Sequence, residues 1–351
     1  MKRELLSIFA ILVIGNCPLA AEPFKVGVSA PFTGDLAEYG EAVRNGFEMS
    51  ASEFSGGELR FIYEDNQYDA KAALTAYRKL VSGEKIDLLF SWGEAPLHAI
   101  APLVQRQGIP TVAMSVDTTP AEDNSSVIIS INTPSQLVER LRRDLRSRGI
   151  KRIGFVVTED PFTQGLYDIF SKTTLPDETV ELIATVPAAE KDFKTIATKV
   201  VGSPYDAIGV YLLSGQVQAL YRELGKLRFV RPSFGSDVFE SRSEIEGSGP
   251  AIEGAVYPNI FVPNEFRDQY RTRFGKDSQM SYAYNSYVVG RWFFGALGKG
   301  KDGTNYTVFE RLRSVAVGES VKLEYAPHNV SFLSFPLVVR RVHTGNFEDV
   351  R

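Results

Sequence analysis

Short apolar segments alternate regularly with segments of helical spacing from residue 24 onward. Lys25-Val26-Gly27-Val28-Ser29 predicts a strand that ends at Pro31, and the apolar residues between Leu36 and Phe54 recur three and four apart, as on one face of a helix. The pattern continues with expected strands at 59–63, 86–90 and 109–113 and expected helices at 70–81 and 96–107. Such alternation with short connections predicts a parallel sheet with helices on both faces.

A second run of the same kind begins near Leu137. It predicts strands at 152–157, 180–185, 207–212 and 232–235, and helices at 134–148, 162–173, 192–201 and 216–227. The two runs share a period but no sequence repeat, which indicates two similar α/β lobes rather than a tandem array. The last third is less regular, with helices expected at 266–274 and 282–298 and strand-like sequence at 332–342.

The first residues predict export. Lys2 and Arg3 precede an apolar run from Leu5 to Ile14, and small residues end at Ala21. This order is typical of a secretory signal peptide, so we expect residues 1–21 to be removed and the protein to act in the periplasm. An apolar N-terminal helix that stays attached is the alternative.

Cys17 is the single cysteine and falls inside the expected signal peptide. The mature chain would then have no thiol, which excludes disulfides, zinc-thiolate sites and cysteine nucleophiles. The residues Ile14-Gly15-Asn16-Cys17 also resemble a lipoprotein processing motif, so lipidation at Cys17 stays open.

Length and charge narrow the class of protein further. About 330 residues (351 minus 21) are enough for two compact lobes, since single cores stop growing at roughly 250–300 residues. The formal net charge of −4, without a basic run, argues against nucleic acid as a partner. No later stretch approaches the ~20 apolar residues that a membrane-spanning helix needs.

Several short motifs, in order along the chain, together resemble one family. They are Val26-Gly27-Val28-Ser29-Ala30-Pro31-Phe32-Thr33-Gly34, Tyr39-Gly40, Glu64-Asp65-Asn66-Gln67 with Asp69, Ala101-Pro102, Gly108-Ile109-Pro110, Thr119-Pro120, Phe162 with Gly165, and Gly235-Ser236-Asp237. The chain is similar over nearly its whole mature length to type I periplasmic binding proteins of the leucine/isoleucine/valine-binding kind.

The resemblance implies two doubly wound parallel-sheet lobes joined by a three-strand hinge. We expect an N-terminal lobe of residues 22–133 plus 260–330 and a C-terminal lobe of 134–259 plus 331–351. The crossings are expected near Asn132–Pro134, Tyr257–Pro263 and Asn329–Ser331. The resemblance further implies a monomer that captures a small molecule in the cleft and delivers it to an inner-membrane ABC permease, without catalytic residues, metal or cofactor.

The cleft should lie at the carboxyl ends of the strands, where doubly wound sheets bind ligands. In amino-acid-binding relatives, hydroxyls and backbone N–H groups of two loops hold the ligand's carboxylate, an acid of the second lobe holds its ammonium, and an aromatic ring covers it. The resemblance places these roles on two loops of the first lobe and three positions of the second: Ser91, Trp92, Gly93 and Glu94; Ser115, Asp117 and Thr118; and Phe162, Ser214 and Asp237. Asp237 corresponds to the ammonium position and Phe162 to the aromatic one, although a turn cap and an ordinary core residue are the alternatives.

Two acids depart from the family pattern. Glu94 stands where a small hydroxyl residue is usual, and Asp117 lies beside Thr118. Two desolvated carboxylates would repel a ligand carboxylate. Either Ser91 and Ser115 take over that role, or the ligand is cationic, amide-like or aromatic and stacks on Trp92.

Three other features have plainer explanations. The run Glu64-Asp65-Asn66-Gln67 lacks the ligand spacing of a calcium loop and predicts a solvated turn that caps the helix from Ala70. Gly298-Lys299-Gly300-Lys301-Asp302-Gly303 matches a dinucleotide motif only in letters, because it follows a helix instead of joining a strand to one. Tyr282, Tyr284 and Tyr287 are expected in core or hinge packing more than in ligand contact.

Enzymatic activity has little support in the sequence. His98, His328 and His343 are widely separated, and no nucleophile elbow, phosphate loop or zinc-protease motif is present. A hydrolase that uses Glu94 with Asp117 is the remote alternative. The nearer alternative is a sensor, which would read the ligand and signal to a membrane kinase or regulator.

Overall fold

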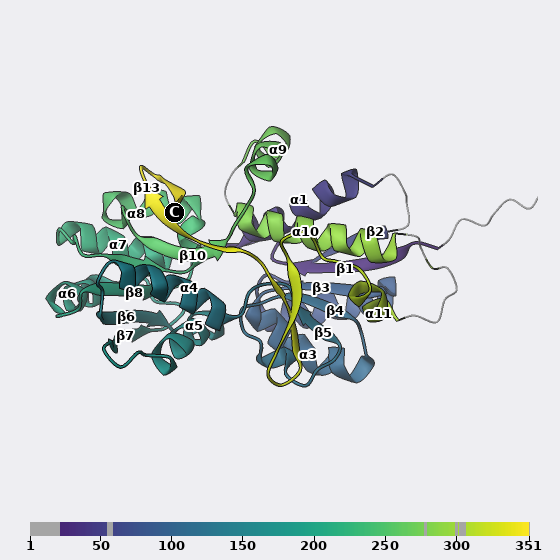
Figure 1. Ribbon diagram of the computed structural model, residues 1–351, viewed down its shortest axis with the longest axis horizontal. Helices are drawn as coiled ribbons and strands as arrows, with labels where there is room; N and C mark the ends of the chain where they lie inside the picture. The colour runs from purple at the N-terminus through teal and green to yellow at the C-terminus, as the bar shows by residue number, and fades with distance from the viewer. Residues whose placement is uncertain (1–21, 55–58, 277–278, 299–300, 302–306, 351) are drawn as a thin grey trace, which may run out of the picture.

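The computed structural model describes residues 22–54, 59–276, 279–298, 301 and 307–350 (Figure 1). The expected signal peptide, most of the segment 298–303 and Cys17 therefore lie outside the described residues. The structure has two lobes, each built on one seven-stranded sheet, which lie end to end along the long axis of the molecule. The predicted fold class, two doubly wound α/β lobes, is confirmed.

The first sheet contains strands from the beginning of the chain and two from near its end, in the order β11-β12-β5-β4-β3-β1-β2. Every pairing in it is parallel except that of β11 with β12. Its strands are β1 (Phe24–Ala30), β2 (Leu59–Asp65), β3 (Leu88–Trp92), β4 (Thr111–Met114), β5 (Val127–Ile129), β11 (Lys322–Ala326) and β12 (Val330–Ser334).

The second sheet repeats this plan in the order β14-β13-β10-β9-β8-β6-β7. The strands from β6 to β10 pair in parallel, and β13 and β14 add antiparallel strands at one edge. Its strands are β6 (Arg152–Thr158), β7 (Thr179–Val186), β8 (Ala207–Tyr211), β9 (Ser233–Gly235), β10 (Val256–Ile260), β13 (Leu337–His343) and β14 (Asn346–Val350).

Helices cover both faces of each sheet, because the central strands are apolar on both sides. In β3, Leu88 and Phe90 join one core and Leu89 joins another, and all three are fully buried. The first lobe carries α1 (Ala37–Ser52), α2 (Ala70–Arg78) with a π-helical turn (Lys79–Glu84), α3 (Glu94–Gln107), α9 (Asn264–Phe274), α10 (Met280–Leu297) and α11 (Val308–Arg313). The second lobe carries α4 (Pro134–Ser147), α5 (Pro161–Lys172), α6 (Lys194–Gly202), α7 (Gln216–Lys226) and α8 (Arg242–Ser248).

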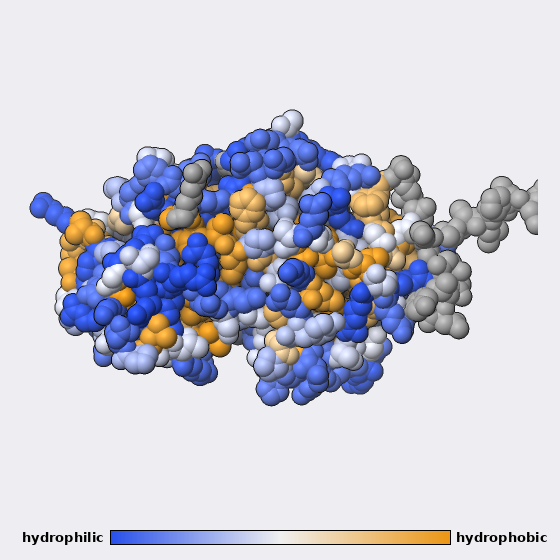
Figure 2. Space-filling view, in the orientation of Figure 1, coloured by the Kyte–Doolittle hydropathy of each residue, from blue (hydrophilic) through white to orange (hydrophobic). Residues whose placement is uncertain are grey.

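The outer surface is mixed in character. Hydrophilic side chains cover most of the visible face of both lobes, with apolar patches between them (Figure 2). None of the helices in the described part of the chain combines the length and the apolar character needed to cross a membrane.

The chain crosses between the lobes in three segments, after β5, after β10 and after β12. The third crossing corrects the prediction: it follows Ser334 and does not lie at Asn329–Ser331. His328 and Asn329 have positive φ and form the turn of the β11–β12 hairpin, and β12 then pairs with β5 inside the first sheet. The turn-forming residues His328 and Asn329 therefore mark a hairpin and not a hinge, and residues 331–334 belong to the first lobe.

The acidic run after β2 braces the loop between β1 and α1. Asp65 accepts hydrogen bonds from the backbone N–H of Phe32 at 2.8 Å and from the hydroxyl of Thr33. Asn66 is fully buried and donates to the carbonyl of Trp92 at 3.0 Å. The cap of α2 is Asp69, whose carboxylate accepts from the N–H of Ala72 at 2.8 Å.

Candidate ligand-binding site

A cavity of about 470 Å³ lies between the two lobes. This volume is within the range of sites that enclose small molecules, roughly 300–1,000 Å³. Residues of both lobes line it. The first lobe contributes Thr33, Gly34, Asp35, Leu36, Tyr39, Gln67, Tyr68, Trp92, Gly93, Glu94, Met114, Ser115, Val116 and Tyr282. The second lobe contributes Phe162, Ala188, Lys191, Leu213, Ser214 and Val238, and Ile131 lies at the first crossing.

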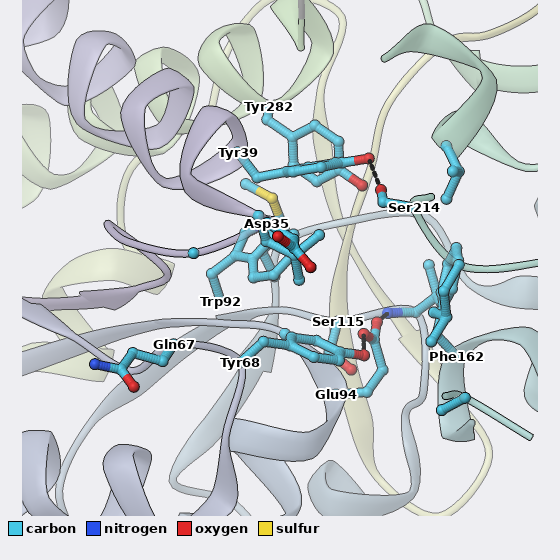
Figure 3. A pocket seen from close by; sticks show the side chains of 18 of the residues that line it. Asp35, Tyr39, Gln67, Tyr68, Trp92, Glu94, Ser115, Phe162, Ser214 and Tyr282 are labelled. Atoms are coloured by element: carbon cyan, nitrogen blue, oxygen red, sulfur yellow. Dashed lines mark hydrogen bonds between the residues drawn. The ribbon is translucent and has the colours of Figure 1, made fainter. Parts of the chain in front are cut away.

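Aromatic rings form much of the wall. The ring centroid of Tyr39 lies 5.4 Å from that of Trp92 and 5.1 Å from that of Tyr282. Tyr68 lies 5.7 Å from Trp92. Figure 3 shows Tyr39 and Tyr282 on one side of the cavity, Tyr68 opposite them, and Phe162 of the second lobe at one end. The indole N–H of Trp92 is buried and has no hydrogen-bond partner among the described residues.

Two glycines allow this arrangement. Gly93 has a φ of +101°, and a Cβ there would lie 2.8 Å from the ring of Tyr68. A Cβ on Gly40 would lie 2.0 Å from the carbonyl oxygen of Pro31. Glycine at these positions lets α3 start directly after β3 and lets α1 approach the end of β1, which brings Tyr39 to the cavity.

Glu94 begins α3 and projects into the cavity wall. Its side chain is largely buried, with the residue 7% exposed. One carboxylate oxygen accepts from the backbone N–H of Val116 at 3.0 Å, and the other accepts from the hydroxyl of Tyr68 at 3.1 Å. The helix N-terminus also favours an anion there. Burial nevertheless raises the pKa of Glu94 from 4.5 to about 7, with a smaller contribution from the negative charge of Asp160.

Hydrogen bonds join the lobes around the cavity. The hydroxyl of Ser241 donates to Glu38 at 2.6 Å, and the hydroxyls of Tyr39 and Ser214 are 3.4 Å apart. The hydroxyl of Tyr282 donates to the carboxylate of Asp237. The lobes are therefore in contact, and a ligand in this arrangement would touch both of them.

The sequence matches the family model described as periplasmic binding protein over residues 23–327. The chain belongs to this family. It is 24% identical over 224 residues to Leu/Ile/Val-binding protein homolog 6 of Brucella abortus, which covers 61% of this chain and 57% of that relative. It is 24% identical to Leu/Ile/Val-binding protein BraC3 of Rhizobium johnstonii, over 74% of this chain and 73% of the relative. The first of these relatives is thus matched over little more than half of its length.

Solved structures of binding proteins share the fold. The leucine binding protein LivK from Thermotoga maritima superimposes with a TM-score of 0.80 at 19% identity, covering 93% of this chain and 98% of that one. A solute binding protein from R. palustris, solved in complex with benzoate, gives a TM-score of 0.77 at 15% identity over 93% and 95%.

The structure brings six of the ten predicted site residues of this binding protein to the cavity wall. They are Trp92, Gly93, Glu94, Ser115, Phe162 and Ser214. Ser91 does not line the cavity, because its side chain is fully buried within the first lobe. Thr118 also lies outside it, at the start of a short 3-10 turn.

Asp117 points away from the cavity. Its carboxylate pairs with His98 of α3, with Nε2 and Oδ2 2.6 Å apart, and accepts from the N–H of Thr119 at 2.9 Å. The expected pair of acids, Glu94 with Asp117, is therefore not assembled, and the hydrolase alternative loses its second carboxylate. Of the two acids expected to repel a ligand carboxylate, only Glu94 lines the cavity.

Asp237 lies behind the wall and not on it. Burial raises its pKa to about 6, and its carboxylate is engaged by Tyr282 from the other lobe. Asp237 lines a smaller adjoining pocket that shares Val116 and Phe162 with the cavity, so its ammonium-binding role stays a prediction. Tyr282 itself lines the cavity, which corrects its assignment to packing, whereas Tyr284 packs against Phe266.

The main residues that the sequence did not reveal are Tyr39, Tyr68 and Asp35. Tyr39 and Asp35 come from the segment after β1, and Tyr68 follows the acidic run after β2. Their place in the sequence could have revealed them, because both segments follow strands of a parallel sheet and must therefore lie at its carboxyl edge, where ligands bind.

Proposed function

We propose that this protein is a periplasmic receptor that captures a small molecule between its lobes and delivers it to an ABC importer. The observation that carries the proposal is the cavity lined by both lobes, with hydrogen bonds from Ser241 to Glu38 and from Tyr282 to Asp237 beside it. A ligand that touches both lobes stabilises their closed arrangement, which is a population shift. A transporter can then recognise surfaces of the two lobes in that arrangement.

The relatives support the coarse function and leave the ligand open. Relatives are named for leucine, isoleucine and valine, one structural neighbour is described with isoleucine, and another with benzoate. The family is described as periplasmic binding protein, which supports a periplasmic location, and residues 1–21 would supply the export signal for this chain. We propose a monomer, with the small molecule and the inner-membrane permease as its partners.

The first test asks whether a small molecule occupies the cavity. The chain from residue 22 is purified without denaturation. Small molecules that co-purify with it are then released by denaturation and identified by mass spectrometry. The released compounds are added back to ligand-free, refolded protein. A ligand at 100 times its Kd should add about 2.7 kcal/mol of stability and raise Tm. Ser214→Trp, which places an indole in the cavity, is the control and should not respond. An equal shift in both proteins, or none in either, would contradict the proposal.

Delivery is tested in cells. Deletion of the gene should abolish uptake of the radiolabelled compound found in the first test, and the full-length gene should restore it. Normal uptake together with a lost transcriptional response to the compound would favour a sensor instead.

A further inference from the structure

The buried charged group on the cavity wall is acidic. The lining residues include the carboxylates of Asp35 and Glu94 and the ammonium of Lys191; Asp35 and Lys191 are both solvent-exposed, whereas Glu94 is buried. The carboxylate of Asp160 lies close enough to act on Glu94, and the residue is 9% exposed. A ligand therefore meets negative charge on the buried side of the cavity.

The carboxyl group of Glu94 has no cationic partner among the residues that the structure describes. The groups that act on its carboxylate are the N–H of Val116, its own backbone N–H, the hydroxyl of Tyr68 and the like charge of Asp160. None of the lysines, arginines and histidines in the described ranges forms an ion pair with it. Each carboxylate oxygen has accepted one side-chain or backbone hydrogen bond and retains a lone pair for a ligand donor. A buried carboxylate in this condition favours a positive partner.

Glu94 also occupies the groups that could hold an anion. It takes the N–H of Val116, and its side chain lies at the N-terminus of α3, where the helix dipole would otherwise attract a negative ligand group. A ligand carboxylate at this end would have to compete with Glu94 for the same donors and would be repelled by it. The chain thus supplies its own anion at this position.

Four aromatic rings of the first lobe stand around the cavity. Tyr39, Tyr68, Trp92 and Tyr282 form a connected set with neighbouring centroids 5.1–5.8 Å apart, and all four line the cavity. Aromatic faces attract a cation while burying the apolar body that carries it. In Figure 3 the carboxyl group of Glu94 lies beside the hydroxyl of Tyr68, across the cavity from Tyr39 and Tyr282.

We propose that the ligand of this cavity is an amine: a protonated or quaternary nitrogen, held by Glu94 and the surrounding rings, on an aromatic or branched apolar body that lacks a carboxylate. The inference rests on the proposed receptor function and specifies its ligand class. The free indole N–H of Trp92 can donate to an uncharged oxygen of the same ligand, as in an amino-acid amide.

The test uses two series, each built on one apolar body, whose members carry an amine, an amino-acid amide, an amino acid, a neutral amide or a carboxylate. The phenyl series contains 2-phenylethylamine, phenylalaninamide, phenylalanine, 3-phenylpropionamide and 3-phenylpropionate. The branched series contains isopentylamine, leucinamide, leucine, 4-methylpentanamide and 4-methylpentanoate. Binding to ligand-free refolded protein is measured by calorimetry at pH 8 and by thermal shift. We expect the amines to bind at least tenfold more tightly than the matching amino acids, neutral amides and carboxylates. The amino-acid amides, whose α-amino group is about half protonated at pH 8, should bind more weakly than the amines and more tightly than the neutral amides.

Two variants separate the charge of Glu94 from its packing. Glu94→Gln keeps the shape and an acceptor for Val116, so it should weaken the amines tenfold or more while leaving the neutral amides within about twofold. Asp117→Asn removes a nearby carboxylate that faces His98 outside the cavity, and it should change neither class.

The outcomes distinguish the inference from the function on which it rests. Tightest binding of leucine, phenylalanine or a carboxylate, or amine binding that Glu94→Gln leaves unchanged, would overturn the ligand class and leave the receptor function intact. No binding by any compound of either series, together with no co-purifying small molecule, would overturn both.

Discussion

Glu94→Gln should stabilise the ligand-free protein above neutral pH and have little effect on its stability in mild acid. Burial raises the pKa of Glu94 from 4.5 to about 7, so the folded protein holds its proton more tightly than the unfolded chain does. The favourable contribution of the protonated carboxyl is complete below pH 4.5. It is lost as the pH rises from 4.5 through about 7, because the unfolded state ionises first.

The magnitude follows from the pKa difference. A shift from 4.5 to about 7 corresponds to about 3 kcal/mol at 1.36 kcal/mol per unit, and Glu94 is 7% exposed, so solvent reduces this little. Glutamine avoids the cost of burying the charge and still accepts from Val116. The variant should therefore gain about 3 kcal/mol over the wild type between pH 4.5 and pH 8, which shifts Tm by several degrees.

The assay is urea unfolding of both ligand-free proteins at intervals from pH 4.5 to pH 8. Asp117→Asn is the matched control of opposite sign. Burial raises the pKa of Asp117, but the hydrogen bonds from Thr119 and His98 outweigh this and leave the pKa below its usual value. That variant should lose stability relative to the wild type near neutral pH, with the difference shrinking as the pH falls. A pH-independent difference between Glu94→Gln and the wild type would refute the reasoning.

Two further variants test the hinge and the closed arrangement. Arg340→Met leaves the buried Glu240 without its ion-pair partner, so the free energy of unfolding in urea should fall by about 3–5 kcal/mol. An unchanged unfolding midpoint would mean that the ion pair does not stabilise the protein. Ser241→Ala removes the hydrogen bond to Glu38 between the lobes, so small-angle scattering of ligand-free protein should give a larger radius of gyration, whereas an identical profile would show that this bond does not hold the lobes together.

The sequence predicts the two lobes well because each strand and helix leaves a pattern of apolar residues within its own segment of the chain. Alternating strands and helices appear as periodic apolar residues, and strands buried on both faces, such as β3, appear as continuous apolar runs. The same logic places the loop that contains Trp92 and Glu94 at the edge of the first sheet, where the structure has it. The β11–β12 hairpin was misread because its turn and a hinge crossing share the same polar, turn-forming residues.

The details of the site depend on contacts between distant segments. Asp117 was expected in the cavity, but two local partners, Thr119 in its own turn and His98 on the preceding helix, direct it outward. Tyr282 is expected from the sequence in core or hinge packing more than in ligand contact, yet it reaches both the cavity and Asp237 of the other lobe. Periodicity reports which face of a helix is apolar and not what lies against it.

In the proposed site, Glu94 is the residue that distinguishes this cavity from the amino-acid site that the resemblance implies. A small hydroxyl residue in place of Glu94 would leave the N–H of Val116 and the N-terminus of α3 free for a ligand anion. The carboxylate of Glu94 instead accepts the hydrogen bond from Val116 and occupies the N-terminus of α3. The hydrogen bonds from Tyr68 and Val116 orient this carboxylate, but neither group carries a positive charge that would neutralise it. Under the proposed ligand class, the same backbone would thus change from a site that offers positive potential to one that favours a positive ligand, with no change in the fold.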